Sequence, residues 1–182
     1  MKKQNLEHHV SFGFSFDNAS NDYKVVSILT DTSHFVSRVS VYSLHWNSWK
    51  TIEHGKLNVR VIQPRATIVK GLFYWLIEEN SVPSHFGLVW FNVQSGILGT
   101  TSLPGSTICR NVFEFKESVA VSTECTYDQS ISIWKQDDDC SWIKILTLSG
   151  IAGLDNFLDV YTRANLSDKL NMMNWVYTTL RT

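Results

Sequence analysis

The chain has 182 residues, of which 43% are hydrophobic and 13% aromatic, enough to fill one sizeable core or two small ones. Its 16 basic and 17 acidic residues form no long run of either sign, so no strong field favours nucleic acid or an anionic membrane as the main partner. Composition therefore favours a globular chain that binds a protein or a small molecule.

The beginning of the chain, residues 1–9, is predicted to be a polar extension, since it lacks the apolar segment of a secretory signal. The longest apolar run, residues 72–77, is too short to span a bilayer. The three cysteines, Cys109, Cys125 and Cys140, are odd in number and widely spaced, which favours reduced thiols over a disulfide framework. We therefore expect a cytoplasmic or nuclear protein.

From residue 10 onward, aromatic and β-branched residues alternate with polar ones at the period of half-buried strands. A unit of two strand pairs, each joined by a polar turn, occurs three times. Its equivalent positions Tyr42, Phe91 and Trp134 are 49 and 43 residues apart, close to the roughly 40 to 50 residues of a four-stranded propeller blade. We predict blades at residues 10–52, 66–103 and 108–148, with residues 53–65 as a connection.

Residues 149–182 follow a different pattern, because their apolar residues fall at helical spacing. We predict a C-terminal tail with one or two short helices. Helices that cap the exposed edge of the β array are one interpretation, and a helix that docks onto another protein is the other. The apolar residues in question are Leu154, Phe157, Leu158, Tyr161, Leu166, Leu170, Met173 and Tyr177.

The predicted fold class is all-β, an incomplete propeller of about three antiparallel blades. Closed propellers usually have about four to eight blades. We therefore expect an open arc, or a ring that a partner completes.

Four sequence words occur in order along the predicted blades. They are FGFSFD running into NDYKVV (residues 12–26), VYSL with NSW (41–49), GLFYWL (71–76), and ISIW followed by WIK (131–144). In these words the chain resembles the F-box-associated domain of plant F-box proteins, which include the pollen S-locus F-box proteins. The resemblance implies a kelch-like propeller, similar in architecture to the central domain of galactose oxidase, over residues 10–148.

The resemblance also implies a function, which is to hold a target protein for an SCF-type (Skp, cullin and F-box) ubiquitin ligase. No F-box precedes residue 12, and the predicted tail replaces further strands, so we interpret the chain as a fragment, a truncated paralogue or a shortened product. The Skp adaptor is then a partner only of a longer form with an F-box. A truncated chain would instead act as a decoy that binds the target without recruiting the ligase.

Catalytic chemistry is not indicated by any motif, since Gly-x-Ser-x-Gly, His-Glu-x-x-His and phosphate-binding glycine loops are absent from the sequence. The six histidines lack metal-ligand spacing. We expect no enzyme activity, metal or cofactor, and an enzyme on a propeller scaffold is the less favoured alternative.

The tryptophans divide into two groups. Trp46 lies at the tip of a predicted hairpin, where strand alternation cannot bury it, so it is a candidate exposed anchor. The others considered lie within predicted strands, where a large apolar side chain fills the space between blades. Core packing is therefore predicted for Trp49, Trp75, Trp90, Trp134 and Trp142.

The two faces of the predicted propeller differ in their loops. Within each predicted blade, the loop between the second and third strands lies on the same face of the propeller as the connections between blades, and we call this the loop face. The turns between the first and second strands and between the third and fourth strands lie on the opposite face, which we call the turn face. The longer loops are on the loop face, and binding residues concentrate on loops held by a rigid scaffold. The candidate protein-binding residues, of which Arg60, Arg65 and Phe86 are expected outside every strand, are Phe35, Arg60, Arg65, Glu78, Glu79, His85, Phe86 and Arg110.

Overall fold

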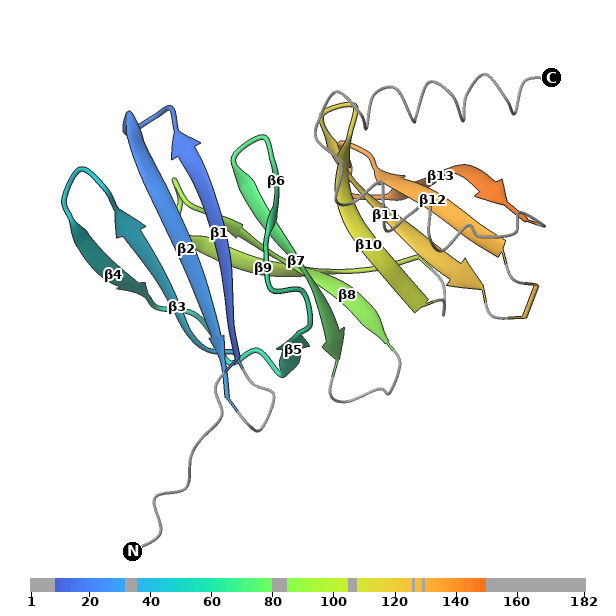
Figure 1. The fold of residues 1–182 in the computed structure, drawn as a ribbon, viewed down its shortest axis with the longest axis horizontal. Helices are drawn as coiled ribbons and strands as arrows, with labels where there is room; N and C mark the ends of the chain where they lie inside the picture. Colours follow the sequence, from blue (N-terminus) through green and yellow to red (C-terminus); the bar gives the residue numbers. More distant parts are fainter. Residues whose placement is uncertain are drawn as a thin grey trace, which may run out of the picture.

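The computed structural model describes residues 9–31, 36–79, 85–104, 108–125, 127–128 and 130–149. All secondary structure in these residues is β-strand, arranged as three antiparallel sheets that follow one another in an arc (Figure 1). The predicted all-β class and the three blades are confirmed. The predicted tail helices lie outside the described residues. No helix in the described part of the chain is long and apolar enough to cross a membrane.

Blade 1 is a four-stranded meander in which each strand pairs with the next along the chain. Its tight turns are permitted by Asn21 and Asn47, which adopt the left-handed backbone conformation with φ of 48° and 46°. The strands are β1 (His9–Asp17), β2 (Asp22–Thr30), β3 (Val36–Ser43) and β4 (Ser48–Ile52).

Blade 2 has a first strand that is split in two. The short strand β6 pairs with the beginning of β7, and β5 pairs with its end. The prediction that residues 53–65 are only a connection is therefore wrong, because Val59 and Val61 are buried in β5 and pair with β7. The strands are β5 (Val59–Val61), β6 (Thr67–Val69), β7 (Leu72–Glu79), β8 (Phe86–Asn92) and β9 (Ile97–Ser102).

Blade 3 repeats the simple meander of blade 1. Its first hairpin has a two-residue turn, Lys116 and Glu117, in which both residues have positive φ. The corresponding turn of blade 2 is Lys70 and Gly71, also with positive φ. The strands are β10 (Ile108–Phe115), β11 (Ser118–Cys125), β12 (Ser130–Gln136) and β13 (Trp142–Leu148).

Two apolar clusters join the blades, because alternate residues of each strand point to opposite faces of its sheet. Each blade has two faces. The forward face is the one turned toward the next blade along the chain, and on blade 3 it is the face turned away from blade 2. The opposite face of each blade is its backward face. The first cluster packs the forward face of blade 1 on the backward face of blade 2, with Val26, Ile28 and Val39 against Phe73, Trp75 and Phe91. The second packs blade 2 on blade 3, with Tyr74, Leu76 and Leu88 against Val112, Val119 and Val121.

Hydrogen bonds also connect neighbouring blades. Phe12 of β1 donates its N–H to the carbonyl of Pro64 (2.9 Å) and accepts from the N–H of Ala66 (2.7 Å). Trp142 of β13 donates its Nε1–H to the carbonyl of Ser102 in blade 2 (2.9 Å). These bonds help to fix the relative positions of neighbouring sheets.

The tryptophan predictions are confirmed in part. Trp75 is completely buried, and three others are half-buried against the second cluster: Trp90, Trp134 and Trp142. Trp46 is exposed at the hairpin tip, as predicted. The prediction for Trp49 is wrong, since its side chain is 54% exposed on the backward face of blade 1, where no described blade packs.

Candidate protein-binding face

A row of three candidate residues crosses the loop-face end of blade 2. Arg60 of β5 lies opposite Glu78 of β7, and Glu78 lies opposite Phe86 of β8. Cross-strand neighbours project to the same side of a sheet, so all three lie on the forward face. The Arg60 guanidinium and the Glu78 carboxylate form an ion pair across β5 and β7.

A second pair lies beside this row. The backbone N–H of Glu79 donates to the carbonyl of His85 (2.9 Å) and closes the end of the β7–β8 hairpin. The Glu79 carboxylate lies 3.2 Å from Nδ1 of His85, which makes no hydrogen bond. Five of the eight predicted residues therefore lie at this end of blade 2, with Glu79 and its neighbour His85 on the side of β7 opposite to the row, because successive residues of a strand point to opposite faces. We call them the loop-face cluster: Arg60, Glu78, Glu79, His85 and Phe86.

The other three candidates do not join this cluster in the described structure. Arg65 is exposed between β5 and β6, where it forms a parallel bridge with Phe12 of blade 1. Arg110 belongs to strand β10, but its side chain lies outside the described structure, as does the whole of Phe35.

The expectation that Arg60 and Phe86 lie outside every strand is wrong. Arg60 belongs to β5 and Phe86 to β8. Phe86 is half-buried and packs against the second cluster, so it supports the junction of blades 2 and 3 as well as the surface. A three-residue strand such as β5 has too few residues to show a period in the sequence.

The chemistry of the loop-face cluster suits contact with a protein surface. The side chains of Arg60, Glu78, Glu79 and His85 are 43%, 26%, 31% and 37% exposed, so all four reach solvent in part. With His85 neutral, one arginine and two glutamates give the cluster a formal charge of −1. The cluster can accept hydrogen bonds from basic side chains and can donate from the guanidinium of Arg60.

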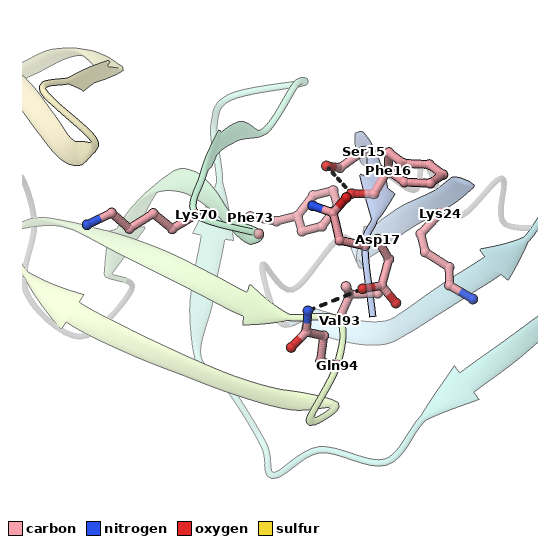
Figure 2. A pocket seen from close by; sticks show the side chains of 10 residues that line it. Ser15, Phe16, Asp17, Lys24, Lys70, Phe73, Val93 and Gln94 are labelled. Atoms are coloured by element: carbon pink, nitrogen blue, oxygen red, sulfur yellow. Dashed lines mark hydrogen bonds between the residues drawn. The ribbon is translucent and has the colours of Figure 1, made fainter. Parts of the chain in front are cut away.

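The turn face carries a polar pocket of about 260 Å³ between blades 1 and 2. Figure 2 shows Asp17 of β1 and Gln94 of the β8–β9 turn directed toward each other, with 3.2 Å between Gln94 Nε2 and Asp17 Oδ1. The hydrogen bond from Ser20, together with weaker ones from Ala19 and Gln94, lowers the pKa of Asp17 despite burial. Because its carboxylate already accepts these bonds, Asp17 serves as a connection between blades.

A second carboxylate, Asp22, organises the turn face of blade 1. It accepts hydrogen bonds from Ser43 Oγ (2.5 Å), Lys24 Nζ (2.6 Å) and the backbone N–H of His45 (2.8 Å). Burial acts to raise the pKa of Asp22, but these bonds outweigh it and hold the pKa well below its ordinary value. Ser43 in turn accepts from the N–H of Trp46 (3.1 Å), so this network holds the hairpin tip in place.

Sequence reasoning missed both of these carboxylates. Asp17 and Asp22 flank the first turn within the family words, and a pair of acids around a turn between strands was the available signal. Their roles depend on Gln94 and Ser43, which are distant along the chain. No local pattern reports such contacts.

Catalytic or metal chemistry finds little support in the described residues. Burial raises the pKa of the Cys109 thiol to about 12, the opposite of what a nucleophilic thiolate needs. No group of three or more His, Cys, Asp or Glu in the described ranges is placed to hold a metal ion.

No curated protein matches the chain with significant similarity. The model of one family, described as "F-box associated beta propeller domain", matches residues 1–172. The match covers all three blades and the loop-face cluster. The chain therefore belongs to the F-box associated beta propeller domain family.

Proposed function

We propose that this chain is the target-binding part of a substrate receptor of an SCF-type ubiquitin ligase, with no enzymatic activity of its own. Membership of the F-box associated propeller family carries the proposal, because this domain is a protein-interaction module that belongs with F-box proteins. The Skp adaptor is a partner only where the domain is joined to an F-box.

We further propose that the target binds the loop-face cluster. The cluster places one partly exposed ion pair, Arg60 with Glu78, and a close contact of Glu79 with His85 on the end of a rigid sheet. Binding residues held by strands need less ordering than residues on free loops, which favours affinity. The polar pocket on the turn face is a weaker candidate, since its carboxylate is already bonded to Ser20, Ala19 and Gln94.

The location proposed for the protein is the cytoplasm or the nucleus. Cys109, Cys125 and Cys140 are all free thiols, and free thiols are typical of reducing compartments. A fluorescent fusion of the chain that accumulated in the secretory pathway would contradict this.

The binding face is tested with two matched double variants. The loop-face variant, Arg60→Gln with Glu78→Gln, removes both members of one ion pair, so that no charge is left unpaired. The turn-face variant, Lys70→Gln with Glu117→Gln, does the same to a pair at 3.9 Å on the opposite face. Immobilised wild-type chain should capture a discrete target from cell extract, and the purified target then serves for titration.

We expect the loop-face variant to bind the target at least about tenfold more weakly than the wild type, which corresponds to about 1.4 kcal/mol. The turn-face variant and Trp46→Ala should bind as the wild type does. Loss of binding in the turn-face variant, with the loop-face variant unaffected, would place recognition on the other face.

The receptor and decoy functions are separated by joining the chain to an F-box. If the chain is a recognition module, the fusion should shorten the half-life of the captured protein in cells, and proteasome inhibition should restore it. The chain alone should lengthen that half-life, because it occupies the target without recruiting a ligase. A fusion that leaves the half-life unchanged would contradict the receptor role.

A further inference from the structure

Among the described residues, the largest concentration of exposed apolar side chains lies on the backward face of blade 1. Five aromatic residues on this face are between 40% and 60% exposed: Phe12, Phe14, Phe16, Tyr23 and Trp49. Taking about 200 Å² for a whole aromatic side chain, these five expose about 500 Å². The largest apolar patch of a typical monomer is about 300 to 600 Å² and often marks an interaction site.

The middle of this patch is free of charge. Register places Phe12 beside Ser27, Ser40 and Thr51 in one row, and Phe14 beside Val25, Tyr42 and Trp49 in the next. Tyr23 stacks on Phe14, with ring centroids 5.5 Å apart, and meets Phe16 edge-on at 5.0 Å. The charged side chains at this patch lie at its edges: Arg38 at one corner of the row that begins at Val10, and Arg65 beside Phe12, to which it is bridged. Depletion of charge is typical of the centre of a protein interface.

Comparison within the repeat shows what kind of surface covers such a face. The backward face of blade 2 carries Phe73 and Trp75, both completely buried by the preceding sheet. The backward face of blade 3 carries Val112 and Val121, which are 4% and 0% exposed. By this comparison, a β-sheet face suits the equivalent face of blade 1 better than a peptide or a small molecule does.

We propose that two copies of this chain associate through the backward faces of blade 1, as a two-fold symmetric dimer with a sandwich of two four-stranded sheets at its centre. Sheets pack face to face in this way with their strands about 30° apart. The five aromatics, with Val10, Val25 and Tyr42 between and beside them, approach the about 800 Å² per partner that a stable interface buries.

The other end of the arc explains why association stops at two copies. On the forward face of blade 3, Phe113, Phe115 and Ile133 are only 4%, 7% and 6% exposed. That face is not free to receive blade 1 of another copy, so head-to-tail growth is blocked. A self-complementary contact between identical patches closes as a dimer.

The test is sedimentation equilibrium of the 182-residue chain from about 1 µM to about 100 µM, which detects a dimer with a dissociation constant in the micromolar range or below. We expect the mass to rise from the 20.8 kDa of one copy toward twice that value. A single-copy mass throughout this range would overturn the proposal.

Variants then locate the interface. Ser27→Arg places a charge in the middle of the patch, and Phe14→Thr with Trp49→Thr removes two of its exposed aromatics while keeping β-branched residues in the strands. Both should remain monomeric at about 100 µM, with circular dichroism spectra like the wild type. Ile97→Arg, at a residue that is 56% exposed on blade 2, should still form dimers.

Two results contradict the location of the interface. One is a dimer that persists in Ser27→Arg and in the double variant, and the other is a dimer that Ile97→Arg also abolishes. Because target binding is measured separately on the loop-face cluster, a monomeric chain would leave the proposed function standing.

Discussion

The close approach of blade 1 to blade 2 at Gly13 gives a sharp test of the packing described above. A Cβ built on Gly13 would overlap Cδ1 of Phe73 and lie 2.8 Å from both Phe73 Cε1 and the Cβ of Ala66, whereas ordinary contacts are 3.4–4 Å. Phe73 is completely buried, and its ring stacks on Trp75 with a centroid separation of 6.0 Å. A shift of the ring away from the new Cβ would therefore disturb its packing on Trp75.

Gly13→Ala should accordingly lower the free energy of unfolding by about 3 kcal/mol, the upper end of the range for overpacked cores. Urea denaturation followed by circular dichroism measures this change. The matched control is Gly55→Ala, where an added Cβ would meet nothing within 4 Å. We expect the control to stay within about 0.5 kcal/mol of the wild type.

A double variant tests the cause of the loss. Phe73→Leu removes the ring atoms that collide with the new Cβ, so the combination Gly13→Ala with Phe73→Leu should be more stable than the sum of the two single changes predicts, by about 1 to 2 kcal/mol. Additive effects, or a Gly13→Ala variant as stable as Gly55→Ala, would refute the contact between β1 and Phe73.

Two further predictions concern the turns and the buried carboxylate. The variant Glu117→Gly gives blade 3 the Lys-Gly turn of blade 2. It should raise the free energy of unfolding by about 0.5 to 1 kcal/mol, because glycine adopts the left-handed backbone conformation of this position (φ 59°) without strain. Glu117→Ala should give no such gain, and equal melting temperatures of the two variants would contradict the prediction. The lowered pKa of Asp22 means that its carboxylate stabilises the fold above the unfolded-state pKa of about 3.9 and loses this effect as pH falls through the folded value. The difference in free energy of unfolding between wild type and Asp22→Asn, measured by urea denaturation, should therefore shrink below about pH 4. A difference that is independent of pH would argue against the hydrogen-bond network of Asp22. The control is Asp138→Asn in the exposed β12–β13 turn.

Much of the fold was accessible from the sequence because its signals are local. Alternation at a period of two identifies a strand within a few residues, and tight turns such as Lys70 and Gly71 show where strands reverse. The repeated spacing of Tyr42, Phe91 and Trp134 then gave three blades, and all three of these residues lie on the backward faces of their sheets.

What the sequence could not give depends on contacts between distant segments. Trp49 occupies a strand position that suits burial, but burial requires a neighbouring sheet, and its own alternation contains no information about that neighbour. The pairing of Arg60 with Glu78 depends on the register of β5 against β7. The loop-face cluster was therefore predicted as a set of loop residues and is in fact held largely by strands.

Binding of the purified target by the loop-face variant, compared with the turn-face variant, tests the central claim most directly. Each change removes both members of one ion pair and leaves the net charge unchanged, and the two pairs lie on opposite faces. Isothermal titration calorimetry should show the dissociation constant raised at least about tenfold by Arg60→Gln with Glu78→Gln. It should be unchanged by Lys70→Gln with Glu117→Gln. Equal affinities of both variants and the wild type would contradict recognition through the loop face of blade 2.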